Sequence, residues 1–229
     1  MRLGSGDEIR SIENAMYAAG LAENELMERA GRQTCDWIVK HFSKKQFKKI
    51  LIVAGPGNNG GDALVVAKNL SSRLRSDFSA GLELKCFSNQ LNGLSIENLE
   101  KFLGEKLSDT DLIVDGLFGI GQNRPLSGNN LEIVKKINES SAKVISLDCP
   151  SGLNVDTGIA FGLAVKANWT LSFGLLKPGF YLQNGPESCG KIIRLDIGFL
   201  PELIRALAKS YFLFGKSWAR RVLPVRQDT

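Results

Sequence analysis

Two adjacent amide side chains and a carboxylate are gathered in the segment Gly55–Asp62 (GPGNNGGD), which follows a short apolar run. The segment satisfies the spacing G-x-G-x-x-G, which is typical of a dinucleotide site when it joins a strand to a helix. Two features oppose an ordinary dinucleotide site. Asp62 places a negative charge where a diphosphate would approach the helix, and no acid ends the next strand at Lys85–Phe87 to hold a ribose. A capping role for Asp62 is the structural alternative, but it leaves Asn58 and Asn59 unexplained, and their amides suit a neutral polar ligand or a hard cation.

Two further apolar runs each end in an acidic residue. Asp115 precedes the glycine-rich segment 116–126, in which Arg124 has the fork-shaped side chain that grips a phosphate. Asp148 precedes a bend that begins at Cys149. Because parallel strands present their carboxyl ends at one edge, we expect both acids to face one crevice, where one holds a cation and the other exchanges protons. Asp115 taken alone is equally explained as a turn cap, and Cys149 as a small buried thiol.

These turns require a scaffold in which strands alternate with helices. Short β-branched apolar runs indicate buried parallel strands, and the stretches between them have helical periodicity. The predicted strands are 50–54, 82–87, 112–115, 144–148, 169–173 and 191–196, and the predicted helices are 7–19, 24–42, 62–75, 95–106 and 129–138. Asn24 is the expected N-cap of the second helix. The alternation predicts an α/β fold: a doubly wound, Rossmann-like three-layer α/β/α sandwich with a mostly parallel sheet and two extra N-terminal helices.

Composition excludes several classes of protein. The 229 residues, 43% hydrophobic and 23% charged, suit one large folded domain. No apolar stretch approaches the roughly 18 residues of a membrane span, and the N-terminus lacks the apolar core of a signal peptide, so we expect a cytoplasmic protein without a membrane partner. The four cysteines form no CxxC pair, which favours reduced thiols. The single histidine, His41, is expected at a solvated helix end, which disfavours histidine triads and most zinc chemistry.

The net charge of +5 is concentrated near the C-terminus. Residues 202–229 carry six basic side chains against two acidic ones, so a charge of only +1 remains for the first 201 residues. Segment 214–229 therefore reads as a basic tail or linker after a domain of residues 1–213, and not as a nucleic-acid-binding arm.

Four motifs in chain order carry a family resemblance: GPGNNGGD (55–62), DGLFGIGQNRPL (115–126), LDCPSGLNVDTG (147–158) and FGLLKPGFYLQNGPESCG (173–190). With the helical lead-in 25–31, the sequence resembles the YjeF N-terminal domain, the NAD(P)H-hydrate epimerase family, over about residues 5–200. The resemblance implies interconversion of the R and S forms of hydrated NADH and NADPH, which carry a hydroxyl on carbon six of the nicotinamide ring. This reaction belongs to nicotinamide nucleotide repair, where a dehydratase accepts one epimer.

The resemblance also implies the site residues. Substrate contacts fall on Asn58, Asn59, Gly60, Gly61 and Asp62, on Gly119, Ile120, Gly121, Gln122, Asn123, Arg124 and Pro125, and on Asp148. A potassium ion is held by Asn59, Asp115 and Ser151, an all-oxygen set that suits a hard cation. Asp148 is expected to act as general acid when hydroxide leaves, and then as base when water returns to the opposite face of the ring iminium. Lys177 is the second expected catalytic residue, which sets the local charge, with a solvated loop lysine as its alternative.

The expected partners follow from the same resemblance. Family members pair, and Met27, Trp37 and Phe42 on the N-terminal helices supply apolar surface, so we expect a homodimer. Residues 223–229 resemble the lead into the ADP-dependent dehydratase domain of bifunctional relatives, which implies functional coupling to such a domain.

Two rival functions remain open at this point. A non-catalytic scaffold of the same fold, binding RNA-decay or lipoprotein partners, is disfavoured by the intact acids Asp62, Asp115 and Asp148 and by Ser151. An NAD dehydrogenase is disfavoured because the ribose-binding acid and a catalytic histidine are missing.

Overall fold

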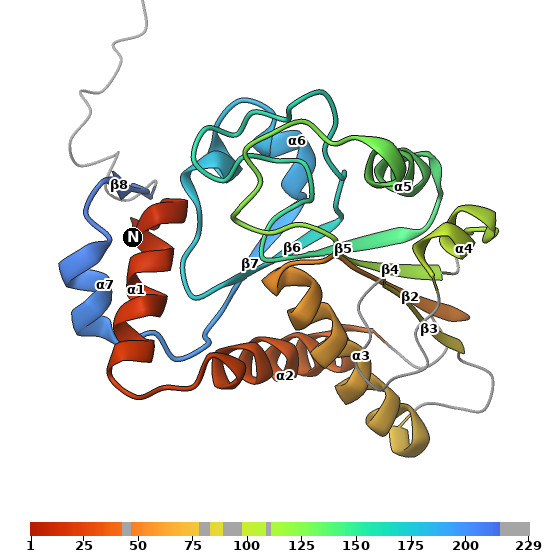
Figure 1. Ribbon diagram of the computed structural model, residues 1–229, viewed down its shortest axis with the longest axis horizontal. Helices are drawn as coiled ribbons and strands as arrows, with labels where there is room; N and C mark the ends of the chain where they lie inside the picture. The colour runs from red at the N-terminus through yellow and green to blue at the C-terminus, as the bar shows by residue number, and fades with distance from the viewer. Residues whose placement is uncertain (43–46, 78–82, 89–97, 109–110, 216–229) are drawn as a thin grey trace, which may run out of the picture.

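Helices cover both faces of a parallel sheet in the computed structural model, which describes residues 1–42, 47–77, 83–88, 98–108 and 111–215 (Figure 1). The strands of this sheet are β2 (Lys49–Ala54), β3 (Glu83–Ser88), β4 (Asp111–Gly116), β5 (Lys143–Leu147), β6 (Trp169–Phe173) and β7 (Lys191–Leu195). They are ordered β3-β2-β4-β5-β6-β7, and each neighbouring pair is parallel. The prediction of a doubly wound α/β fold is confirmed.

The side chains of β2 show why its sequence is apolar throughout. Ile50 and Ile52 belong to the core on one face of the sheet, and Leu51 and Val53 belong to the core on the other face. The first core is covered by α1 (Gly6–Ala18), α2 (Glu23–His41) and α3 (Asn58–Asp77), and the second by α4 (Leu99–Gly104) and α5 (Gly128–Glu139). Three short helices follow in the C-terminal part: η1 (Pro178–Tyr181), α6 (Gly185–Cys189) and α7 (Pro201–Leu207).

Two predicted helix starts are wrong. The second helix begins at Glu23 with Ala22 as its N-cap, so Asn24 lies inside the helix. Helix α3 begins at Asn58, four residues earlier than predicted, which places Asp62 inside the helix and removes its capping role. The glycines before it are required by close packing: a Cβ on Gly60 would lie 1.8 Å from the Gly55 carbonyl oxygen. Predicted residues 82 and 95–97 lie outside the described residues.

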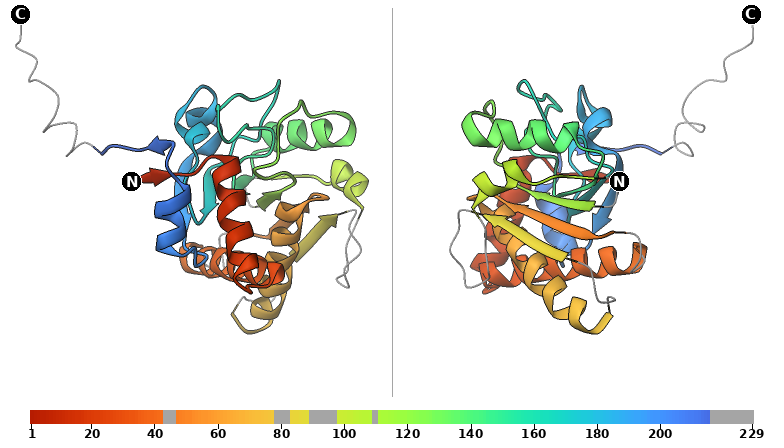
Figure 2. Two further views of the ribbon diagram at one scale, coloured as in Figure 1. Left: turned by 60° about the vertical axis from the view of Figure 1, so that its left-hand side comes forward. Right: turned by 90° about the vertical axis from the view of Figure 1, so that its right-hand side faces the viewer.

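The two ends of the described chain meet beside α1 and α7 (Figure 2). Strand β1 (Arg2–Leu3) pairs antiparallel with β8 (Tyr211–Phe212). The Glu8 carboxylate of α1 accepts hydrogen bonds from the backbone N–H groups of Lys209 and Ser210, both at 2.9 Å. Burial alone would raise the pKa of Glu8, but hydrogen bonds from Ser5 and Ser210 lower it to about 2. Helix α1 is therefore fastened to the C-terminal part of the domain.

Two of the three residues expected on a dimer surface are core residues. Trp37 and Phe42 are buried, and Phe42 packs edge-on against Trp169 with ring centroids 5.1 Å apart. Met27 is partly buried and contacts the site described below. The apolar surface on which the dimer prediction relied is therefore absent at these positions.

The structure also bears on the expectations for the cysteines, for His41 and for membrane-spanning segments. All four cysteines are buried and none is in a disulfide. His41 is exposed as the last residue of α2, where its ring stacks on Trp37. Among the described helices, none is both long and apolar enough to cross a membrane.

Candidate active site

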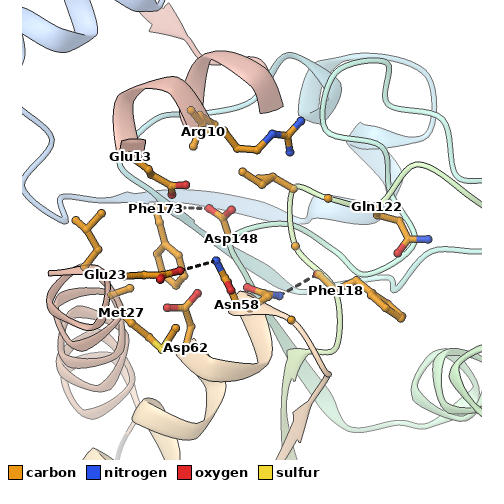
Figure 3. Close-up of a pocket in the computed structure, with 18 of the residues that line it drawn as sticks. Arg10, Glu13, Glu23, Met27, Asn58, Asp62, Phe118, Gln122, Asp148 and Phe173 are labelled. Atoms are coloured by element: carbon orange, nitrogen blue, oxygen red, sulfur yellow. Dashed lines mark hydrogen bonds between the residues drawn. The ribbon is translucent and has the colours of Figure 1, made fainter. Parts of the chain in front are cut away.

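A cavity of about 470 Å³ lies at the carboxyl ends of β2, β4 and β5, between α1, α2 and the start of α3 (Figure 3). This volume is in the range of ligand-binding pockets. Of the predicted substrate-binding residues, the following line it: Asn58, Asn59, Asp62, Gly119, Ile120, Gly121, Gln122, Asn123, Arg124 and Asp148. The edge of the sheet predicted from strand-end residues is thus where the cavity lies.

The remaining predicted residues lie behind or beside the wall. Gly60, Gly61 and Pro125 do not line the cavity. The α carbon of Gly61 faces the Met27 side chain, which a Cβ would approach to 2.7 Å, so this glycine allows α2 and α3 to pack closely. Asp115 is fully buried and also does not line the cavity, which corrects the expectation that Asp115 and Asp148 face one crevice.

Asp148 is held in an unusual conformation directly after β5. Its φ of 61° lies in the left-handed region, which non-glycine residues rarely adopt and which is often found at functional sites. Its Oδ1 accepts a hydrogen bond from the Phe173 N–H at 2.9 Å and another from Lys177 Nζ. These contacts orient one carboxylate oxygen from two sides.

Lys177 is completely buried, so its alternative as a solvated loop lysine is wrong. Its ammonium group also donates to Ser172 Oγ at 2.8 Å and lies 5.9 Å from the centre of the Phe180 ring. A buried ammonium needs a paired charge, and Asp148 supplies it. Cys149 is fully buried, and burial raises the pKa of its thiol well above the usual range, which confirms it as a structural thiol.

Hydrogen bonds link the three predicted potassium ligands, Asp115, Ser151 and Asn59, through the backbone of Phe118 in the loop that follows β4. The Asp115 carboxylate accepts hydrogen bonds from Ser151 Oγ at 2.6 Å and Ser146 Oγ at 2.8 Å. Burial raises the pKa of Asp115, although these hydrogen bonds act in the opposite direction. Ser151 Oγ also accepts the Phe118 N–H at 2.9 Å, and Asn59 Nδ2 donates to the Phe118 carbonyl at 2.8 Å.

Asn59 Oδ1 is a buried acceptor without a hydrogen-bond partner among the described residues. An unsatisfied buried oxygen costs free energy unless a donor or a cation compensates it. The same side chain is linked through the Phe118 backbone to the Ser151 hydroxyl and from there to the negatively charged Asp115. This donor set fits a hard cation that prefers oxygen ligands.

Helices α1 and α2 contribute cavity residues that sequence analysis missed: Arg10, Glu13 and Tyr17 on α1 and Glu23 on α2. Burial, followed by the neighbouring charge of Asp148, raises the pKa of Glu13 to about 7. Burial, then Asp148, then Glu13 also raise the pKa of Asp62 well above its usual range. One signal was present in the sequence: Glu13 interrupts the apolar stripe of Ile9, Ile12 and Met16 that α1 buries.

Comparisons with known proteins identify relatives of this chain. A family model described as YjeF-related protein N-terminus matches residues 23–179. The chain is 35% identical over 188 residues to the NAD(P)H-hydrate epimerase of Limosilactobacillus fermentum, covering 77% of this chain and 87% of that protein. For the NAD(P)H-hydrate epimerase of Elusimicrobium minutum the identity is 32% over 227 residues, covering 89% and 99%.

Longer relatives and a solved structure complete the comparison. The bifunctional NAD(P)H-hydrate repair enzyme Nnr of Thermosynechococcus vestitus is 36% identical over 236 residues, covering 96% of this chain but 45% of that protein. The chain therefore spans less than half the length of this bifunctional relative. The crystal structure of yeast ynu0 has the same fold, with a TM-score of 0.70 and 19% identity over 95% of this chain and 98% of that one. Because the family model matches more than half of the residues, the chain belongs to the YjeF-related protein N-terminus family.

Proposed function

We propose that this protein is an NAD(P)H-hydrate epimerase, an isomerase that interconverts the R and S epimers of hydrated NADH and NADPH. The observation that carries the proposal is the cavity at the strand ends, where Asp148, held from behind by the buried Lys177, meets further carboxyl groups. The chain is 35% identical to a named epimerase. Loss and return of a hydroxyl beside a ring nitrogen needs proton transfer and stabilisation of a ring cation, and carboxyl groups supply both.

Asp148 is the carboxyl group best placed to exchange a proton with the substrate hydroxyl. Both of its hydrogen bonds fall on Oδ1, which leaves Oδ2 without a protein partner among the described residues. Lys177 and the Phe173 N–H keep the side chain in one orientation, so its proton transfer is directed at a fixed point. Asp148 acts as general acid when hydroxide leaves from the face of the ring that it reaches, and as general base when water returns to that face.

The rim of the cavity suits the phosphates of a dinucleotide. Arg10 and Arg124 line the rim and are exposed, whereas the acidic groups Glu13, Asp62 and Asp148 lie deeper. This separation of charge places a neutral or cationic ring inside and anionic groups outside.

The proposal includes a potassium ion held by Asn59, Asp115 and Ser151. Bound there, the cation supplies positive charge beside the buried carboxylate. The chain's own contribution is to connect β4, β5 and the Phe118 backbone, which fixes the start of the loop lining the cavity. Asn59 Oδ1, which has no described hydrogen-bond partner, supports this assignment.

The cellular setting belongs to the same proposal. We place the protein in the cytoplasm as a homodimer, with residues 214–229 as a tail outside the catalytic domain. The relatives named as bifunctional repair enzymes support coupling to an ADP-dependent dehydratase, because fusion joins two steps of one repair. The dimer does not rest on Trp37 or Phe42, which are buried.

One assay tests the proposed reaction. Purified protein is added to the pure R-hydrate of NADH or of NADPH, and the appearance of the S form is followed in potassium and in sodium buffers. We expect conversion above the rate without protein, and faster conversion in potassium. Conversion no faster than in the protein-free control would refute the epimerase assignment.

A further inference from the structure

Inversion at a ring carbon requires chemistry on both faces of the ring. The hydroxyl leaves from one face and water returns to the other, so proton transfer is needed on each side. Asp148 enters from the end of β5, and its Oδ1 is fixed by Lys177 and the Phe173 N–H. A carboxylate held in this way serves one face of a bound ring, and a group on another wall must serve the second.

Glu13 occupies such a wall. Its side chain extends from α1 into the cavity toward Asp148, whereas Asp62 enters from α3 below them (Figure 3). Glu13 is partly buried, and its carboxyl group forms neither a hydrogen bond nor an ion pair with the described residues. The other two acids of α1 are engaged, since Asp7 pairs with Arg10 at 2.7 Å and Glu8 caps the helix. Glu13 is therefore the carboxyl group of α1 that is available to a ligand.

We propose that Glu13 is a second catalytic residue, which exchanges protons on the face of the nicotinamide ring opposite to Asp148. This role rests on the proposed epimerase function and deepens it. Glu13 lies on α1, outside the segment 23–179 that the family model matches. With this role for Glu13, α1 contributes part of the chemistry.

The reaction balances with these two groups alone. Glu13 gives its proton to the hydroxyl on its face, the C–O bond breaks with its electron pair leaving on water, and the ring nitrogen lone pair forms an iminium bond. Water then bonds to the same carbon from the other face, the iminium electron pair returns to nitrogen, and ionised Asp148 takes the proton released by water. Return of this proton from Asp148 to Glu13 restores the starting state, and the reverse reaction uses the groups in exchanged roles.

The surroundings of the two carboxyl groups differ. The titratable and charged side chains around Glu13 are Arg10 and Tyr17 on α1, Glu23 on α2, Asp62 on α3, and Asp148 with its partner Lys177. Burial and then Asp148 raise the pKa of Glu13 to about 7, although Lys177 and Arg10 act in the opposite direction. Asp148 forms an ion pair with the buried ammonium group of Lys177. Carboxyl groups in different environments can divide acid and base roles.

Oxygen exchange measured separately for each epimer tests this division. Wild type, Glu13→Gln and Asp148→Asn are incubated with each pure epimer in water enriched in ¹⁸O. Label in the remaining starting epimer and conversion to the other epimer are both followed, and exchange without protein is subtracted. Glu28→Gln is the matched control, because this partly buried residue pairs with Lys68 at 3.4 Å outside the cavity.

We expect both site variants to lose epimerisation by roughly a hundredfold, the usual scale of general acid–base catalysis. Each variant should still exchange oxygen in one of the two epimers. The epimer that still exchanges should differ between the two variants. Glu28→Gln should behave like wild type. Circular dichroism shows whether the variants are folded, and Glu13→Asp, which keeps the carboxyl group but shortens its reach, should retain part of the activity.

Three outcomes would overturn the assignment of Glu13. The first is near-normal epimerisation by folded Glu13→Gln. The second is an equal loss of oxygen exchange in both epimers for Glu13→Gln. The third is exchange in one epimer only for Asp62→Asn but not for Glu13→Gln, which would transfer the role to Asp62. A wild-type protein without epimerase activity would instead refute the proposed function. The two failures are therefore distinguishable.

Discussion

Glu13 should make the folded protein less stable at neutral pH than at acidic pH. Its pKa rises from an ordinary value of 4.5 to about 7, first because of burial and then because of Asp148. Between these values the folded chain keeps a proton that the unfolded chain releases, so the free energy of unfolding falls as pH rises through this window. At about 1.4 kcal/mol per pKa unit, the full difference corresponds to an upper limit of about 3 kcal/mol.

Glutamine has nearly the same shape as glutamate but carries no charge at any pH. Relative to wild type, Glu13→Gln should therefore gain up to about 3 kcal/mol in unfolding free energy between pH 4.5 and pH 8. Urea unfolding of both proteins at a series of pH values measures this difference, from which the titration of other groups largely cancels. The gain should shrink when Asp148 is also replaced by asparagine.

Two results would refute this reasoning. A difference between wild type and Glu13→Gln that does not change with pH would show that Glu13 ionises as readily in the folded chain as in the unfolded one. If wild type instead becomes more stable relative to Glu13→Gln as pH rises, the folded protein stabilises the charged form of Glu13. Glu28→Gln, which removes one carboxyl group outside the cavity, is the control for the loss of a negative charge.

Three further predictions concern the catalytic acid, the cation and the tail. Asp148→Asn should fold normally but lose epimerase turnover by roughly a hundredfold, since an amide keeps the shape but exchanges no proton, and near-normal turnover would remove Asp148 from the mechanism. Asp115→Ala should lose potassium binding, measured as the rise in melting temperature with added potassium, and an unchanged affinity would contradict the assigned site. Deleting residues 214–229 should preserve epimerase activity and dimerisation by light scattering, because it spares β1, β8 and every proposed ligand. Salt-sensitive RNA binding that disappears with the tail, in a filter-binding titration, would instead identify a nucleic-acid arm.

The sequence by itself determined the layered α/β architecture and the edge of the sheet that carries the site. Both follow from local regularities: β-branched apolar runs such as that in β2 alternate with helical periodicity, and parallel strands present their carboxyl ends together. The motifs at these ends also indicated the family. They predicted Asp148 as a site residue, and Asp148 lines the cavity. The start of α3 was missed because glycines ordinarily disfavour helix, whereas here close packing against Gly55 requires them.

Tertiary structure alone decided which of these groups face the cavity and which charges are buried. Asp115 and Asp148 look alike in sequence, yet the first lies behind the wall with Ser151 and the second lines the cavity. From the sequence, Lys177 could equally be a solvated loop lysine, but the fold buries it beside Asp148. The properties of Glu13 arise where α1 meets the end of β5, far away in the sequence. Burial and electrostatic coupling are set by packing between distant segments, and periodicity within one segment carries no record of them.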